Sequence, residues 1–352
     1  MTGEILNRYH SFWNYEKTNR PILHITVPQY INTEGWDEIK PKSLEDEWEN
    51  VEARYSLFRY QIEHSSYFAE GFPTERAFMG SVCLAGMIGC DYQYMPQTVW
   101  FGLKDPIIKD WSDFESISIN KKSPMFQLVE NIYNKFGKYL DGKYHLGMTD
   151  LGGNLDILCP LRGTEELLLD LIYNPDDVIK AVEKTDQLFE EAYDHFYSII
   201  TAHGQHGMSS WMGIWCDDRY FPLQCDFAAM ISPDHFHRFV MPSLTRACNY
   251  LDNSMFHLDG PAMIPHVDHL LSIERLNGIQ WTPGDGQPPI WDDKWFGLYN
   301  KIQSANKNLA LLYINGAENV LKLCDVLSPR GLIIHAILDT EEEAREIIRR
   351  LE

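Results

Sequence analysis

Positive charge is scarce in this chain. Of its 352 residues, 30 are Lys or Arg and 51 are Asp or Glu, which gives a formal net charge of −21 at pH 7. Nucleic acids and anionic membrane surfaces bind to basic faces of proteins, so we expect neither as a partner. A polyanionic small substrate would need a local cluster of arginines, and the sequence has no obvious one.

Long apolar runs and paired cysteines are missing as well. No run approaches the roughly 18 apolar residues of a membrane-spanning helix. Residues Met1 to Leu6 lack the basic and apolar regions of a signal peptide. The seven cysteines stand singly, at positions 83, 90, 159, 216, 225, 248 and 324, and none forms a CxxC pair. An odd number of scattered cysteines argues against a disulfide framework, so we expect a cytoplasmic protein.

The second half of the chain has a regular alternation of short apolar strands and helical segments. We predict strands at 254–258, 278–281, 308–314 and 331–338. Each is followed by a helical pattern, in units of about 25 to 40 residues, as in a parallel sheet. Strands of such a sheet are buried on both faces, which fits their continuous apolar runs.

The same pattern favours a closed barrel over an open dinucleotide-binding sheet. No GxGxxG motif follows the first predicted strand, 21–28, and polar or aromatic residues stand at nearly every predicted strand end. We therefore predict an α/β fold with one domain over residues 1–352, a (β/α)8 barrel of the TIM type. A helical extension at 3–17 precedes it, and long loops are inserted, above all at 66–120.

The segment around which the predicted site is organised runs from Met255 to Pro261, with the sequence MFHLDGP. Residues i and i+2 of a strand point to the same side, so His257 and Asp259 should leave the strand end side by side. With His335 from the last strand they would form a three-ligand set with one open position, as in a catalytic zinc site. Two alternatives stay open: a metal-free pair for acid–base work or binding, and a purely structural pair.

A second candidate is the polar, glycine-rich loop after the predicted strand 144–148. It carries Asp150, Asn154 and Asp156. Two carboxyl groups near a barrel mouth can do general acid–base work, and Asp150 is the candidate catalytic acid. Equally, Asp156 could accept a hydrogen bond from Arg162 and only hold the loop.

Aromatic and amide side chains near the predicted strand ends form the third candidate. These side chains stack on flat organic groups and hydrogen-bond to them. The set comprises Trp211, Trp215, Gln224, Gln280, Trp281 and Tyr313, to which Asn154 is added. Any one of them alone is an ordinary core residue, but together they predict a substrate pocket for an aromatic or extended ligand.

Five segments together resemble the uroporphyrinogen decarboxylase-like superfamily, over essentially the whole chain. They are RPI at 20–22, LRGTEELL at 161–168, ISPDHF at 231–236, HLDG at 257–260 and TEEEA at 340–344. The resemblance implies a single (β/α)8 barrel. It says little about which reaction of the superfamily is catalysed.

Within that superfamily the pattern is closest to the corrinoid-dependent methyltransferases. True decarboxylases carry an arginine-rich segment near the N-terminus, where this chain has PQYIN at 28–32. Thiol-methylating members bind zinc through His-x-Cys-Gly and a cysteine near the last strand. Here His257-x-Asp259-Gly260 and His335 stand at those places. Harder ligands suit an oxygen-bearing substrate better than a thiolate, and related barrels demethylate methoxylated aromatics.

The resemblance thus implies transfer of a methyl group from a small O- or N-methylated compound, with a methoxy-aromatic favoured, to the cobalt of a partner corrinoid (cobalamin) protein. Zinc at His257, Asp259 and His335 would polarise the leaving oxygen, and Asp150 would protonate it. The chain has no Asp-x-His-x-x-Gly signature of a corrinoid domain of its own. Two other functions stay open: a cofactor-free decarboxylase or lyase acting on a small carboxylic acid, and a non-enzymatic ligand-binding barrel. Whether the protein forms a homodimer also stays open.

Overall fold

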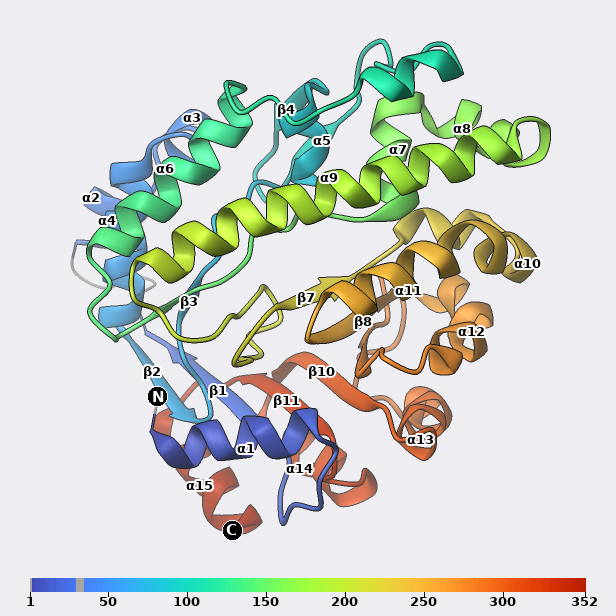
Figure 1. Cartoon of the computed structure of the whole chain (residues 1–352). Helices are drawn as coiled ribbons and strands as arrows, with labels where there is room; N and C mark the ends of the chain where they lie inside the picture. Colours follow the sequence, from blue (N-terminus) through green and yellow to red (C-terminus); the bar gives the residue numbers. More distant parts are fainter. Residues whose placement is uncertain (1, 30–34) are drawn as a thin grey trace.

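The computed structural model describes residues 2–29 and 35–352. Among them, seven strands form one sheet in the order β2-β1-β11-β10-β9-β8-β7 (Figure 1). All neighbours are parallel except β1 and β2. The strands are β1 (Ile22–Pro28), β2 (Ser65–Ala69), β7 (Tyr220–Leu223), β8 (Asn253–Asp259), β9 (Gly278–Thr282), β10 (Asn308–Asn315) and β11 (Leu332–Ile337). The predicted alternation of strand and helix in the second half is confirmed, and so is the α/β class.

The closed eight-stranded barrel is not confirmed. Within the described residues the sheet ends at β2 on one side and at β7 on the other. β2 pairs with the second edge of β1, where a barrel would place the next parallel strand. β7 contains Pro222, which has no N–H to donate to a further strand and is therefore typical of a sheet edge.

Two short ladders lie outside the seven-stranded sheet, and one of them contains part of the predicted strand 144–148. β3 (Thr74–Glu75) pairs with β6 (His145–Leu146) over two residues, and β4 (Tyr92–Tyr94) pairs with β5 (Val99–Phe101). The sequence also predicts a strand over residues 208–215. This segment turns back on itself, because Met208 pairs antiparallel with Cys216 around Gly213, whose φ is +64°. A segment that folds back in this way cannot continue a parallel ladder.

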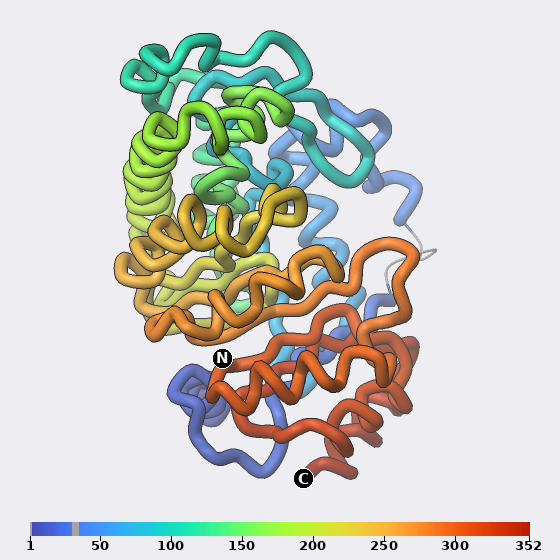
Figure 2. The backbone as a smooth tube through the Cα atoms, turned by 90° about the vertical axis from the view of Figure 1, so that its right-hand side faces the viewer, coloured from blue at the N-terminus to red at the C-terminus, as the bar shows by residue number. Residues whose placement is uncertain are grey.

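Helices cover the outside of the sheet. Helix α11 packs against α9, which packs against α6 and α7 (Figures 1 and 2). Helices α1 and α15, at the two ends of the chain, lie in the same part of the molecule, in the lower half of both views (Figures 1 and 2). The α-helices are α1 (Gly3–Trp13), α2 (Trp36–Ile39), α3 (Leu44–Trp48), α4 (Val51–Glu63), α5 (Cys83–Ile88), α6 (Pro124–Lys138), α7 (Asn154–Arg162), α8 (Thr164–Tyr173), α9 (Pro175–Ala202), α10 (Pro233–His235), α11 (Met241–Tyr250), α12 (Val267–Ser272), α13 (Phe296–Ser304), α14 (Ala317–Val326) and α15 (Glu341–Leu351). The 3-10 helices are η1 (Trp111–Ser116), η2 (Asp226–Met230), η4 (Pro261–His266) and η5 (Asp293–Trp295), and η3 (Phe236–Val240) is a π-helix.

Two further sequence predictions concern the segments that follow β1 and include β2. The 66–120 segment, expected to be irregular, contains β2 to β5, α5 and η1, so it is largely built of short elements. The PQYIN segment cannot be compared with the structure, since positions 30–32 lie outside the described residues. None of the described helices is both long enough and apolar enough to cross a bilayer.

The sheet brings the carboxyl ends of β7, β8 and β9 together. In the register of the sheet, Leu223 lies opposite Phe256, and Asp259 lies opposite Thr282. The carboxyl ends of parallel strands meet at one edge, which is where α/β folds bind ligands. The fold therefore places the HLDG segment at the carboxyl end of β8, beside the ends of β7 and β9.

Candidate active site

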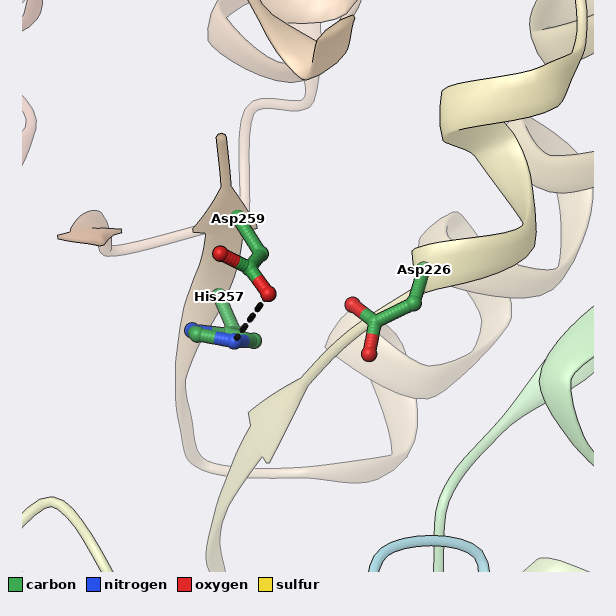
Figure 3. A group of neighbouring side chains, drawn as sticks. All are labelled: Asp226, His257 and Asp259. Atoms are coloured by element: carbon green, nitrogen blue, oxygen red, sulfur yellow. Dashed lines mark ion pairs between the residues drawn. The ribbon is translucent and has the colours of Figure 1, made fainter. Parts of the chain in front are cut away.

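Three side chains from neighbouring strand ends form a compact cluster, shown in Figure 3. Asp226, His257 and Asp259 each offer one ligand atom, and these atoms all lie within 4.8 Å of one another. His257 Nε2 is 4.0 Å from Asp259 Oδ2. His257 and Asp259 lie on β8, as predicted from their i, i+2 spacing, whereas Asp226 opens η2 directly after β7. The third ligand atom thus comes from a residue that the sequence did not single out.

Gln280 on β9 fixes the orientation of the His257 ring. Its Nε2 donates to the carbonyl oxygen of Trp281 at 2.7 Å and to Thr282 Oγ1 at 2.9 Å. Both amide hydrogens are thereby used, so Oε1 is turned towards His257 Nδ1, with which it hydrogen-bonds. Because Oε1 can only accept, Nδ1 carries the proton, and Nε2 presents its lone pair towards the carboxylates. This is the arrangement that a second partner imposes on a metal-binding histidine.

The cluster fits a divalent cation in its chemistry and in its size. Tetrahedral zinc bonds of about 2.0–2.1 Å place neighbouring ligand atoms roughly 3.4 Å apart, so small side-chain rotations would complete the site. One imidazole nitrogen and two carboxylate oxygens suit zinc or a harder divalent ion, and no thiolate takes part. Within the described residues neither Asp226 nor Asp259 has a Lys or Arg ion pair. No cationic side chain of the described residues therefore competes with a metal ion for these two carboxylates.

Asp156 holds Asp226 in place. Its two carboxylate oxygens accept hydrogen bonds from the backbone N–H groups of Asp226 and Phe227, both at 2.8 Å. Burial, followed by the nearby Asp226 charge, raises the pKa of Asp156 to about 7. The partner that we considered for it was wrong, because Arg162 Nε donates to Asp170 Oδ2 at 2.7 Å.

Asp150 lies in the loop after β6, only 6% exposed. Burial raises the pKa of its carboxyl to about 7, against the opposing charges of His257 and Arg76, while Asp226 raises it further. Its Oδ1 has no hydrogen-bond partner among the described residues. Asp150 can therefore carry a proton near neutral pH, next to the His257 cluster, as a general acid must.

Of the predicted pocket residues, Gln280 hydrogen-bonds to His257, and Trp211 is the aromatic side chain that contacts the cluster. Its ring meets that of His257 edge-on, with centroids 5.1 Å apart and an interplanar angle of 89°. Asn154, at the start of α7, and Gln224, after β7, are both buried, and Asn154 Nδ2 donates to the Gln224 carbonyl oxygen at 2.9 Å. The structure thus gives Asn154 a bond that holds the loop after β7.

Trp215 and Trp281 are packed in the core instead. Trp281 is 0% exposed and its ring lies 5.0 Å from that of Trp295. Successive strand residues point to opposite faces, so the side chain after Gln280 must face away from His257. Trp215 packs against Tyr9 of α1, with ring centroids 6.1 Å apart.

His335, the predicted third ligand, lies elsewhere on the same edge of the sheet. It pairs in register with His24 of β1, and the two imidazole centroids are 4.3 Å apart. The ring of Tyr313 is 5.3 Å from that of His335. Neither residue belongs to the cluster of ligand atoms around His257.

The comparisons with known proteins add one finding on the fold. No family model and no curated protein matches this chain. A solved structure named "methyltransferase from Methanosarcina mazei" superposes with a TM-score of 0.57 and 12% sequence identity. The match covers 99% of this chain and 97% of the other. At this identity the likeness shows a shared fold over the whole chain.

Proposed function

We propose that this protein is a corrinoid-dependent methyltransferase, which moves a methyl group from a small O-methylated compound to the cobalt of a partner corrinoid protein. The observation that carries the proposal is the His257 ring, which Gln280 turns so that Nε2 faces two carboxylates without Lys or Arg partners. The shared fold with a protein named as a methyltransferase supports it, as does the resemblance of HLDG to a metal-binding motif. An N-methylated donor fits less well, since a leaving oxygen gains more from a Lewis acid.

The chemistry requires a good leaving group. The bond between the methyl carbon and the donor oxygen breaks, its electron pair stays on the oxygen, and the methyl group passes to cobalt(I) of the partner. Alkoxide and phenolate leave poorly, so their developing charge must be neutralised. A divalent cation such as zinc, held by Asp226, His257 and Asp259, would supply Lewis-acid polarisation of that oxygen.

Asp150 supplies the proton in this proposal. With a pKa of about 7 its carboxyl is partly protonated at neutral pH, and burial keeps competing water away. The protonated form donates to the departing oxygen, and the resulting carboxylate is reprotonated from solvent. Asp156 and Gln280 act through Asp226 and His257, so they are positioning residues.

The test combines metal analysis with an assay of methyl transfer. We expect about one divalent ion per chain in the wild type, none in His257→Ala, and an unchanged content in His237→Ala, which alters a histidine on η3. Conversion of cob(I)alamin to methylcobalamin, followed by absorbance with a panel of methoxyarenes, should need the same His257. A metal-free wild type that transfers no methyl group from any donor would contradict the proposal.

A second function, a cofactor-free lyase, draws on one observation of its own. Asp150 is a protonable carboxyl under the influence of the Arg76 guanidinium, and decarboxylation needs a proton donor and a cation for the substrate carboxylate. That function predicts release of carbon dioxide from a small carboxylic acid without metal or corrinoid. A ligand-binding barrel, in contrast, predicts tight binding without any turnover.

A further inference from the structure

A cavity of about 270 Å³ opens at the carboxyl ends of β1, β10 and β11. His24, Arg76, Trp211, Tyr313 and His335 are among the residues that line it. Trp211 also contacts His257, so this cavity and the metal-binding cluster share a wall. The Arg76 charge acts on Asp150, which links the cavity to the candidate acid as well.

The charge of the cavity is opposite to that of the protein. In a chain of net charge −21, the described lining contains the Arg76 guanidinium and no carboxylate. Arg76 forms no ion pair with any residue that the structure describes, and its buried Nε has no hydrogen-bond partner there. The guanidinium lies over the Phe78 ring, 5.0 Å from its centroid, which limits its motion. A planar, positioned guanidinium without a partner suits a carboxylate, which it can bind through two parallel hydrogen bonds.

The two histidines of the cavity are neutral. Burial lowers the pKa of His24 to about 4, and burial also lowers the pKa of His335, as does the neighbouring imidazole. His24 Nδ1 donates to the Gly213 carbonyl oxygen at 3.0 Å, which leaves its Nε2 to accept a hydrogen bond. His335 Nδ1 is buried without a partner among the described residues. Neutral imidazoles suit polar but uncharged groups of a ligand, such as a hydroxyl or an ether oxygen.

Aromatic side chains and strain shape the rest of the cavity. Tyr313 has a φ of +61°, which an aromatic residue rarely adopts, at a shift in the register of β10 between Leu311 and Ile314. A β-bulge of this kind changes the direction of a side chain, and backbone strain such as a positive φ is found most often at ligand-binding sites. Tyr313 is 49% exposed, and Trp211 lines the same cavity. With a volume just below the roughly 300–1,000 Å³ of small-molecule pockets, the cavity has room for one substituted ring.

We propose that this cavity binds a monoanionic, single-ring aromatic carboxylate, with its carboxylate on Arg76 and its ring between Trp211 and Tyr313. If the protein is the methyltransferase proposed above, this ligand is the methyl donor, a methoxybenzoate. That last step rests on the proposed function, whereas the binding itself does not. Arg76 is then the residue that selects a charged donor over a neutral one.

The experiment is calorimetric titration of the full chain with matched probes. Meta-methoxybenzoate is compared with its neutral analogue meta-methoxybenzamide, and acetate serves as an anion without a ring. We expect the carboxylate to bind about 10- to 100-fold more tightly than the amide, and acetate more weakly than both. Arg76→Gln should remove that advantage while amide binding persists, which also reports on its fold. Arg349→Gln, on exposed α15, is the matched control and should behave as wild type.

The outcomes separate this inference from the proposed function. Equal affinity of the wild type for carboxylate and amide would overturn the inference, and this comparison needs no variant that might misfold. An Arg76→Gln protein that still prefers the carboxylate to the amide would also overturn the inference. Transfer from neutral methoxyarenes alone would overturn the inference and leave the methyltransferase standing. Arg76-dependent carboxylate binding without transfer to cob(I)alamin would support the cavity and count against the methyltransferase.

Discussion

Replacing Gln280 with methionine should weaken metal binding without removing any ligand. The substitution keeps the approximate length of the side chain but deletes the oxygen that accepts from His257 Nδ1. In the wild type that oxygen selects the tautomer with a lone pair on Nε2, facing Asp226 and Asp259. Without it, the proton is no longer confined to Nδ1, and the ring can rotate away from the two carboxylates.

The expected loss of metal affinity follows from the number of hydrogen bonds that the substitution removes. One hydrogen bond to a ligating histidine is removed, and such partners are worth about 10- to 100-fold in metal affinity. That range corresponds to roughly 1.4–2.7 kcal/mol at 25 °C. The two bonds from Nε2 to the Trp281 carbonyl and Thr282 Oγ1 are lost as well, which should lower the free energy of unfolding by about 1–3 kcal/mol. The metal affinity must therefore be measured well below the unfolding transition.

The assay is competition for zinc with a chromophoric chelator, using the purified metal-free protein. Gln287→Met, in the exposed loop before α13, is the control and should leave the affinity unchanged. His257→Ala sets the lower limit, since it removes the ligand itself. If Gln280→Met binds zinc as tightly as wild type, then Gln280 does not orient the histidine, and the tautomer argument fails.

Three further predictions follow from the packing and the charges. In the metal-free protein, the pKa of Asp150 is about 7 when folded and about 3.9 when unfolded. The free energy of unfolding should therefore increase as the pH falls from about 8 to about 4, by at most about 4 kcal/mol. Asp150→Asn should flatten this dependence in urea titrations. Glu70→Gln should cost about 3–5 kcal/mol by chemical denaturation, since Glu70 is 2% exposed and accepts from Arg20 through two bonds of 2.8 Å; a loss under 1 kcal/mol would contradict this. Trp281→Phe should lower the melting temperature but leave meta-methoxybenzoate affinity unchanged, because its ring packs on Trp295.

The regular part of the fold could be predicted from local patterns. The strands β8 to β11 match the predicted ranges within about two residues, because a strand buried on both faces is a continuous apolar run. Closure of the ring depends on pairings between distant segments, such as β1 with β2, that no local pattern reports. The apolar run YFPL of β7 was not predicted as a strand, and it is short and contains Pro222, which is unusual in a central strand. Since β7 is an edge strand, the proline is compatible with it.

The difference between local patterns and pairings of distant segments also explains which site residues could be predicted. His257 and Asp259 follow from the i, i+2 rule, which needs only their own strand. Asp226 can be assigned to the site only if β7 is known to lie beside β8. Because β7 was not predicted, the Asp226 carboxylate was not assigned either. His335 was assigned by its position at a strand end, but strand ends on one edge can still be several strands apart: β10 and β9 separate β11 from β8. The signal that could have found Asp226 was the apolar YFPL run followed by polar residues.

The distribution of charge along this edge of the sheet is compatible with the binding of charged ligands. Asp226 and Asp259 stand within 4.8 Å of His257 without a Lys or Arg ion pair among the described residues, and Arg76 lines the cavity behind Trp211 without a carboxylate partner. None of these three charged residues is fully buried, so solvent screens their charges and stability does not require that they be paired; the charges stay available to a ligand. Elsewhere the chain does pair them, as Arg54 does with Glu75 at 2.7 Å and Arg162 with Asp170. Charges of both signs that are kept apart on one edge can instead be balanced by a bound cation on one side and an anionic ligand on the other.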